Sequence, residues 1–129
     1  MDNTRKRILV VEDDADLRTV LSDKLETLNY QVIQAGDGEE AITLLLDEKP
    51  DLILLDLMLP KLDGFKVLER IRHYPEEVIA STKVIVLSNL WSDKDILRAQ
   101  ALKVDEYFVK ANTNLDEVYT KIKTIISSK

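Results

Sequence analysis

The sequence predicts an α/β fold in which helices cover both faces of a doubly wound sheet of five parallel strands. Short runs rich in Leu, Ile and Val alternate along the chain with longer segments of helical periodicity, which is the pattern of βαβ units. Two of these runs, residues 8–11 and 52–55, are wholly apolar, as expected of strands buried on both faces. Both end directly in acidic residues, so acids that are distant in sequence are expected to meet at one edge of the sheet.

The expected strands are the short runs rich in Leu or in β-branched residues. They cover residues 7–11, 31–35, 51–55, 83–87 and 106–109. An expected helix follows each strand. The first helix carries an apolar stripe at spacings of three and four, made of Leu17, Val20, Leu21, Leu25 and Leu28. We expect Asp14 or Asp16 to cap its start.

The other helices are expected at residues 38–48, 64–73, 92–102 and 114–127. Pro50, Pro60 and Pro75 all fall between expected elements, which supports the assignment because proline inside a helix would break it. A length of 129 residues fits one domain. We expect this domain to cover residues 4–127, with residues 1–3 and 128–129 as loose ends.

The composition excludes several classes of function. The absence of Cys excludes disulfides and thiolate metal sites, and a single His means that a metal ion would be held mainly by oxygen ligands. The 24 acidic and 18 basic residues give a net charge of -6, which opposes general binding to nucleic acids and to anionic membranes. Because no apolar segment approaches the length of a membrane span, we expect a soluble, cytoplasmic protein.

Residues that can carry chemistry follow four of the expected strands. Right-handed crossovers make the strands parallel, so the last residues of every strand face the same rim. This rim collects Glu12, Asp13, Asp14, Asp56, Ser88, Asn89 and Lys110. Carboxylates brought this close repel one another unless a cation lies among them, and Mg²⁺ prefers oxygen ligands. Asp13 and Asp56 are our candidates for direct Mg²⁺ ligands.

A carboxylate beside a metal ion can also act as the nucleophile of phosphoryl transfer and form an aspartyl phosphate. Asp56 is the residue best placed for that role. The Lys110 ammonium and the Ser88 hydroxyl would then partner the phosphoryl oxygens together with Mg²⁺. Taken singly, these residues have plainer interpretations: Asp13 and Asp14 as turn and cap residues, Ser88 as a turn hydroxyl and Lys110 as a surface lysine.

Four strand-end segments occur in order along the chain: ILVVEDD, DLILLDLMLPKLDG, VIVLSN and YFVK. Together they resemble the receiver domain of two-component response regulators, of the chemotaxis-regulator type, over nearly the whole chain. The resemblance implies a flavodoxin-like fold with strand order 2-1-3-4-5. It also implies a signalling switch that accepts a phosphoryl group from a histidine kinase or a phosphotransfer protein. Such a domain assists its own phosphorylation and dephosphorylation but is not a turnover enzyme.

The resemblance assigns a role to each residue of the acidic site. It implies that Asp56 is the phosphoacceptor and that Glu12 and Asp13 form the acidic pair around Mg²⁺. The backbone carbonyl of Met58 would complete the protein ligands of the metal ion, beside Asp56 itself.

The resemblance also implies how the switch reports its state. Ser88 matches the switch hydroxyl of the family and Lys110 matches its lysine. Tyr107 matches the aromatic residue that changes rotamer as the hydroxyl moves toward the phosphoryl group. The surface formed by the fourth expected helix, the fifth strand and the fifth helix would then contact an unknown protein target, with no direct role for nucleic acid or membrane.

Two positions depart from the pattern of the family. Ala111 follows Lys110, where receiver domains usually place Pro, often after a cis peptide bond. Because a cis bond before a residue other than proline costs about 3 kcal/mol, we expect a trans bond here and a differently held Lys110. Asn89 follows the switch hydroxyl, where a small residue is usual, so access to Asp56 could be narrower or a bound phosphate could gain an amide contact.

Three other functions compete with the switch. A receiver-like docking module that is not phosphorylated stays open because of Ala111 and Asn89. A phosphatase-like enzyme with an aspartyl nucleophile is disfavoured because Met58 stands where such an enzyme would carry a second acid. Apolar Met58 and Leu90 also offer no group to orient an attacking water, which predicts slow hydrolysis of a phosphoryl state. A flavin-binding domain of the same topology would need a phosphate loop after the first strand, where acids stand instead.

Residues 36–41, Gly-Asp-Gly-Glu-Glu-Ala, fit a dinucleotide-binding motif between a strand and a helix. The three acids would repel a pyrophosphate, and the motif follows the second strand and not the first. We therefore expect a turn that leads into an acid-rich helix start, and no cofactor besides Mg²⁺.

Overall fold

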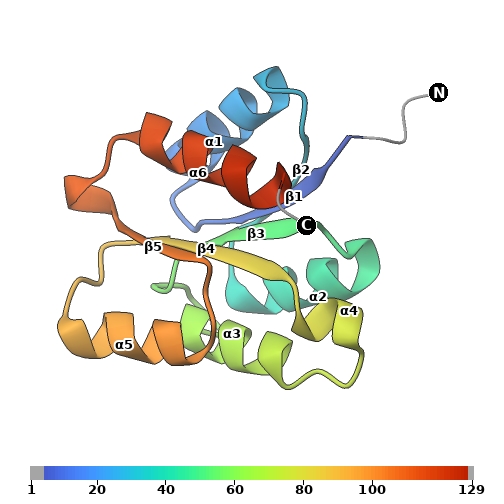
Figure 1. Ribbon diagram of the computed structural model, residues 1–129, viewed down its shortest axis with the longest axis vertical. Coiled ribbons are helices and arrows are strands. Elements are labelled where there is room, and N and C mark those ends of the chain that lie inside the picture. The colour runs from blue at the N-terminus through green and yellow to red at the C-terminus, as the bar shows by residue number, and fades with distance from the viewer. Residues whose placement is uncertain (1–4, 128–129) are drawn as a thin grey trace.

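The computed structural model of the protein describes residues 5–127. The expected loose ends, residues 1–3 and 128–129, lie outside the described residues. A five-stranded sheet forms the centre of the structure (Figure 1). Its strands are β1 (Arg7–Val11), β2 (Gln31–Ala35), β3 (Leu52–Leu55), β4 (Lys83–Ser88) and β5 (Glu106–Val109). Their order is β2-β1-β3-β4-β5 and every pairing is parallel, which confirms the expected doubly wound fold and strand order.

Helices cover both faces of the sheet. They are α1 (Ala15–Thr27), α2 (Gly38–Glu48), α3 (Gly64–Arg72), α4 (Glu77–Ala80), α5 (Asp93–Ala101) and α6 (Leu115–Ser127). Helices α1 and α6 lie on one face, whereas α2, α3 and α5 lie on the other (Figure 1). The loops at the carboxyl ends of β1, β3, β4 and β5 therefore come together at one edge, between the two helical layers.

The core consists of two apolar layers, one on each face of the sheet. Successive residues of a strand point to opposite faces, so each central strand contributes to both layers. The layer under α2, α3 and α5 contains Leu9, Val11, Ile53, Leu55, Val84 and Val86. The layer under α1 and α6 contains Ile8, Val10, Leu52, Leu54, Ile85 and Leu87. The central strands are thus buried on both faces, as their apolar runs predict.

The expected apolar stripe of the first helix is wrong at two positions. Leu21 and Leu25 are buried, but Val20 is 51% exposed and Leu28 is 43% exposed. Successive residues of a helix are separated by about 100°, so Val20 lies to the side of the packed face when its neighbour Leu21 points at the sheet. Leu28 follows the last helical residue, and its backbone N–H caps the helix by bonding to carbonyls of the last turn.

Two short helices, α4 and the 3₁₀ helix η1 (Lys110–Asn112), are absent from the expected elements. Neither is long enough to show an apolar period. The expected bounds also differ by one residue at two strands, because β3 begins at Leu52 and β4 extends to Ser88. Asp51, which was expected to start β3, instead accepts a hydrogen bond from the Arg7 amide through its carboxylate at 2.8 Å.

Capping side chains fix where the loops enter the helices. The Asp14 carboxylate accepts hydrogen bonds from the amides of Asp16 at 3.0 Å and Leu17 at 3.2 Å, so of the two expected caps Asp14 is the correct one. Helices α2, α3 and α5 are capped in the same way by Asp37, Asp63 and Ser92. The cap at Asp14 holds the acidic loop after β1 in a defined path.

The glycine-rich segment at residues 36–41 is such a capped turn. The Asp37 carboxylate accepts the Glu40 amide at 2.8 Å. A Cβ atom at Gly38 would lie 1.8 Å from the carbonyl oxygen of Leu62, so only glycine lets the start of α2 pack against the loop before α3. The expected turn into an acid-rich helix start is confirmed.

Arg72 connects three segments at the edge of the sheet opposite the acidic loop. Its guanidinium donates hydrogen bonds to the carbonyls of Ala80, Thr82, Leu102 and Lys103 at 2.8, 2.7, 2.8 and 3.0 Å. Ala80 ends α4 and Leu102 caps α5, and carbonyls at helix ends have no partner within their own helix. Burial lowers the pKa of Arg72, and the nearby Asp105 carboxylate opposes this effect. One side chain thus holds the ends of α4 and α5 against the end of α3.

Replacing Arg72 with Met is expected to lower the free energy of unfolding by about 3 kcal/mol. A hydrogen bond to a charged group contributes about 1.5–3 kcal/mol, and water replaces part of the lost bonds at this half-buried site. Urea unfolding followed by circular dichroism measures the change. Arg70→Met, an exposed position on the same helix, is the control, with an expected change of about 0.5 kcal/mol or less. Equal values for the two variants would contradict this account of Arg72.

Candidate functional site

Three carboxylates meet where β1 and β3 end. These strands pair side by side with Val11 opposite Leu55, and the Asp56 amide donates to the Val11 carbonyl at 3.0 Å. The residues that follow the two strands therefore lie side by side at the same edge of the sheet. One ligand oxygen from each of Glu12, Asp13 and Asp56 lies within 4.8 Å of the others. The convergence expected from the two acid-terminated runs is present in the fold.

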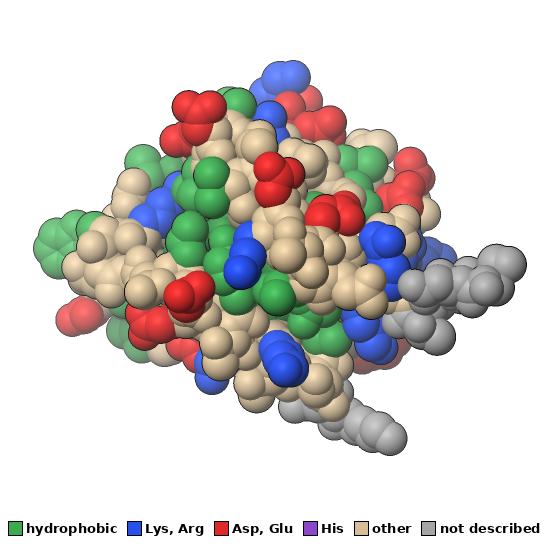
Figure 2. Space-filling view, turned by 90° about the horizontal axis from the view of Figure 1, so that it is seen from above, with side chains coloured by type: hydrophobic (Ala, Val, Ile, Leu, Met, Phe, Trp, Pro, Cys, Tyr) green, Lys and Arg blue, Asp and Glu red, His purple; other side chains and the backbone are tan. Residues whose placement is uncertain are grey.

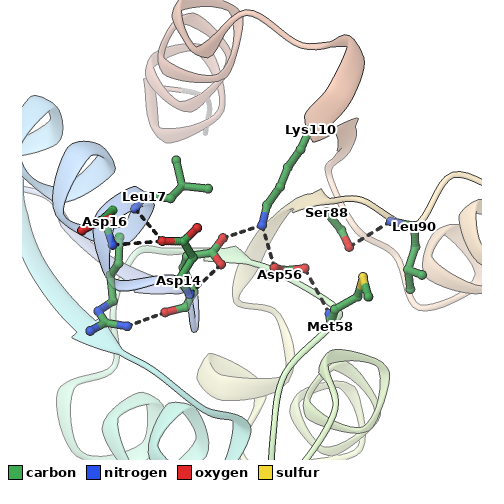
Figure 3. Close-up of polar contacts among 10 residues, drawn as sticks. Asp14, Asp16, Leu17, Asp56, Met58, Ser88, Leu90 and Lys110 are labelled. Carbon is green, nitrogen blue, oxygen red and sulfur yellow. Dashed lines mark hydrogen bonds and ion pairs between the residues drawn. The ribbon is translucent and has the colours of Figure 1, made fainter.

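Lys110 reaches this cluster from the end of β5 (Figure 3). Its Nζ atom donates to Asp56 Oδ2 and contacts Glu12 Oε1, both at 2.8 Å. No cis peptide bond occurs within residues 5–127, so the expected trans bond before Ala111 is confirmed. Lys110, the first residue of η1, nevertheless contacts two of the three carboxylates directly.

Backbone amides hold the two buried carboxylates in fixed orientations. The Met58 amide donates to Asp56 Oδ1 at 3.0 Å, as the labelled side chains in Figure 3 show. The Asp14 amide donates to Glu12 Oε2 at 3.1 Å. Both oxygens of each carboxylate thus have a partner, one a backbone amide and the other Lys110. Asp13 differs, because it is exposed and its carboxylate makes no hydrogen bond within the described part of the chain.

The electrostatics of the cluster favour a cation. Glu12 is 2% exposed and Asp56 is 4% exposed. Burial raises the pKa of Glu12 even though hydrogen bonds from Lys110 and the Asp14 amide lower it, and the Asp56 charge raises it further. Burial alone would lower the pKa of Lys110, but its bonds to Asp56 and Glu12 outweigh burial and raise it. One ammonium therefore balances only part of the charge of three carboxylates.

The donor set suits a hard divalent cation. All three side chains offer oxygen, two are oriented by backbone amides, and the third has a free carboxylate. Mg²⁺ takes one or two protein carboxylates and keeps other positions for water or phosphate oxygens. The residues present therefore fit Mg²⁺, with Glu12, Asp13 and Asp56 as its candidate side-chain ligands.

Ser88 and Tyr107 meet at the backbone of Leu90. The Leu90 amide donates to Ser88 Oγ at 3.3 Å (Figure 3), and the Tyr107 hydroxyl donates to the Leu90 carbonyl at 2.8 Å. Burial, with Asp95 and Asp56 contributing, raises the pKa of Tyr107 to about 12, so this hydroxyl stays protonated at neutral pH. The two expected switch residues thus bind the N–H and the C=O of the same residue, Leu90. Ser88 is buried, whereas Asn89 is exposed.

Sequence reasoning missed two contributors to the site. The main chain of Leu90 links Ser88 to Tyr107, and Arg18 donates to the Glu12 carbonyl at 2.6 Å. Both contacts involve backbone atoms, which every residue type carries. No pattern of side chains marks them in the sequence.

The surface around the helices is mixed in character. Figure 2 views the molecule over α1 and α6, where acidic, basic and apolar side chains are interspersed. Trp91, just before α5, is 72% exposed, and Leu97 within α5 is 63% exposed. Among the described residues, no helix combines the length and apolarity that crossing a membrane requires.

Comparison with known proteins agrees with the family resemblance seen in the sequence. The family model for the response regulator receiver domain matches residues 8–123. The alkaline phosphatase synthesis transcriptional regulatory protein PhoP of Bacillus subtilis is 38% identical over 121 residues, which are 94% of this chain and 48% of that protein. A probable transcriptional regulator ycf27 of Guillardia theta is 37% identical over 107 residues, or 83% of this chain and 40% of that protein. This chain therefore spans less than half of the length of either relative.

Solved structures show the same similarity. The non-phosphorylated HemR receiver domain from Leptospira biflexa has a TM-score of 0.87 and 30% identity, with 97% of each chain covered. The BeF3-activated receiver domain of RstA from Klebsiella pneumoniae has a TM-score of 0.83 and 25% identity, covering 95% of this chain and 100% of that one.

Proposed function

Because this chain belongs to the family of response regulator receiver domains, we propose that it acts as a phosphorylation switch in a two-component system. The match over residues 8–123 confirms the resemblance that the four strand-end segments indicate. We further propose that residues 4–127 act as one receiver domain. The proposed donor of the phosphoryl group is a histidine kinase or a phosphotransfer protein.

The proposed phosphoacceptor is the carboxylate of Asp56. One of its oxygens attacks the phosphorus atom of a phosphohistidine, and an O–P bond forms as the N–P bond breaks. The donor histidine leaves with the electron pair of the broken bond. Asp56 is suited to this reaction because the Met58 amide and the Lys110 ammonium hold its carboxylate in one orientation.

We assign Glu12, Asp13 and Asp56, with the carbonyl of Met58, as the proposed ligands of Mg²⁺. The bound ion would neutralise charge on the phosphoryl oxygens. The Lys110 ammonium supplies a second positive charge beside Asp56, and the Ser88 hydroxyl at the end of β4 is the proposed hydrogen-bond donor to a phosphoryl oxygen. The chain acts as an acceptor that promotes its own phosphorylation, and we do not assign it turnover of a substrate.

The observation that carries this proposal is the meeting of Glu12, Asp13 and Asp56 within 4.8 Å, with Lys110 bonded to two of them. The test is to incubate the protein with Mg²⁺ and acetyl phosphate and to measure its intact mass. We expect a gain of one phosphoryl group that requires Mg²⁺. An unchanged mass, with intact folding shown by circular dichroism, would instead favour a docking module that is not phosphorylated.

We propose that the surface formed by α5, β5 and α6 reports the phosphorylated state to a protein target. Two observations support this assignment. The bond from Tyr107 in β5 to the Leu90 carbonyl links the Ser88 loop to this surface. Leu97, within α5, is an exposed apolar residue. The relatives are described as transcriptional regulators, so a transcriptional output is the proposed role of the pathway. We assign DNA contact to the target and not to this acidic domain.

The phosphoryl group is expected to persist for minutes or longer after the phosphodonor is removed. Met58 and Leu90 are apolar, and no side chain at these positions can orient an attacking water. Intact mass followed over time measures the lifetime. Met58→Asn is expected to shorten it severalfold, because an amide can hold water. Val78→Asn is the matched control, a similarly exposed apolar residue on α4, and is expected to have no effect. A lifetime of seconds for the unaltered protein would contradict the prediction.

A further inference from the structure

Arg18 contacts the acidic loop from the first turns of α1. Its Nη1 atom donates to the carbonyl oxygen of Glu12 at 2.6 Å, and its backbone amide donates to the Asp14 carbonyl at 2.9 Å. The residue between these two carbonyls is Asp13. One arginine therefore holds the main chain on both sides of the exposed acid of the site.

The Glu12 carbonyl belongs to the peptide group that joins Glu12 to Asp13. Because a peptide group is planar, fixing its carbonyl oxygen also fixes the direction in which the chain enters Asp13. The amide on the other side of Glu12 donates to the Ala35 carbonyl at 3.0 Å, so this residue is anchored at both of its backbone groups. The Asp13 carboxylate has no hydrogen bond of its own in the described part of the chain, and its position depends on this backbone.

The guanidinium is held in place by the loop after β2. A Cβ atom at Gly36 would lie 3.2 Å from Arg18 Nη1, so the guanidinium packs directly over the backbone of this glycine. The Gly36 amide in turn donates to the Glu40 carboxylate at 2.8 Å. Arg18 is half-buried and bonds to a carbonyl, not to a carboxylate, so it occupies no carboxylate oxygen of the acidic cluster.

We propose that Arg18 is a positioning residue that sets the Mg²⁺ affinity of the site by holding the Glu12 carbonyl and, through it, Asp13. This inference rests on the proposed function, because it requires that the acidic cluster binds Mg²⁺. Groups that orient metal ligands without touching the metal typically change metal affinity by about 10–100-fold when they are lost.

The test compares the Mg²⁺ dissociation constants of three variants by isothermal titration calorimetry. Arg18→Met is expected to raise the dissociation constant about tenfold or more, because Met keeps the length but has no donor. Arg18→Lys, which keeps one charged donor, is expected to recover part of the affinity. Arg70→Met, at an exposed position near the end of α3, is expected to match the unaltered protein. Phosphorylation is not needed for any of these measurements.

A second measurement needs no metal ion. Hydrogen exchange of the peptide that contains residues 12–14 is expected to speed up in Arg18→Met, while exchange in the strands stays unchanged. If Arg18→Met fails to fold, the affinity of Arg18→Lys decides, and a value equal to that of the unaltered protein overturns the inference. An unchanged dissociation constant in folded Arg18→Met overturns it as well. If the unaltered protein itself binds no Mg²⁺, the proposed function fails, and that result is distinct from failure of the role given to Arg18.

Discussion

Asp56→Asn is expected to abolish uptake of a phosphoryl group from acetyl phosphate in the presence of Mg²⁺. A neutral amide is not a nucleophile toward phosphorus under these conditions, whereas a carboxylate is. Asn keeps the size of the side chain, and its carbonyl oxygen can still accept the bond from the Met58 amide that Asp56 Oδ1 accepts. The loss of reaction is therefore expected without a loss of fold. Intact mass measures phosphorylation, and circular dichroism measures folding.

Asp47→Asn is the matched control for this substitution. Asp47 is an exposed acid on α2, and the same change of one charge is made there outside the acidic cluster. The control is expected to take up one phosphoryl group at the rate of the unaltered protein. Uptake by Asp56→Asn that equals uptake by the control would show that the acceptor is another residue.

Lys110→Met is expected to lower the free energy of unfolding by about 3–5 kcal/mol at neutral pH without Mg²⁺. Removing one partner of a buried ion pair leaves an uncompensated buried charge, and this typically costs about 3–5 kcal/mol of stability. Here the loss leaves two carboxylates, 2% and 4% exposed, close to each other and to Asp13. Urea unfolding measures the change, and Lys123→Met, an exposed lysine on α6, is the control.

The pH dependence of the Lys110→Met variant follows from Glu12. Burial already raises the pKa of Glu12, and loss of Lys110 removes an interaction that lowers it. A carboxyl group whose pKa is raised in the folded state destabilises the fold above its ordinary pKa, and this cost disappears as the pH falls below that value. We therefore expect the loss of unfolding free energy in Lys110→Met to be largest at neutral pH and to become smaller toward acidic pH.

Mg²⁺ provides a separate measurement on the same variant. Added Mg²⁺ is expected to recover part of the lost stability, because a cation in the acidic cluster replaces the missing charge and binds only the folded state. A deficit that is equal at acidic and neutral pH and insensitive to Mg²⁺ would mean that Lys110 contributes through packing and not through charge.

The sequence by itself determined the architecture and the location of the acidic site. Apolar runs at residues 8–11 and 52–55 become β1 and β3, because a strand buried on both faces needs apolar side chains at every position. Once both runs are parallel strands of one sheet, the acids that follow them must share an edge. Strand-end placement therefore located Glu12, Asp13 and Asp56 without coordinates.

Other features of the fold could not be read from the pattern. Helix α4 has four residues and η1 has three, so neither repeats an apolar position often enough to be recognised. The exposure of Val20 depends on how α1 is rotated against the sheet, and Leu28 lies beyond the last residue of that helix. Spacing alone permits more than one rotation, and packing selects one of them.

The tertiary structure alone decided which polar groups join the site to the rest of the fold. Arg18 holds the Glu12 carbonyl, Leu90 joins Ser88 to Tyr107 through its backbone, and Arg72 binds four carbonyls at and just after the ends of two helices. All of these contacts use main-chain groups, which are the same in every residue. A sequence pattern records side chains, so it can show which carboxylates meet but not which backbone atoms hold them there.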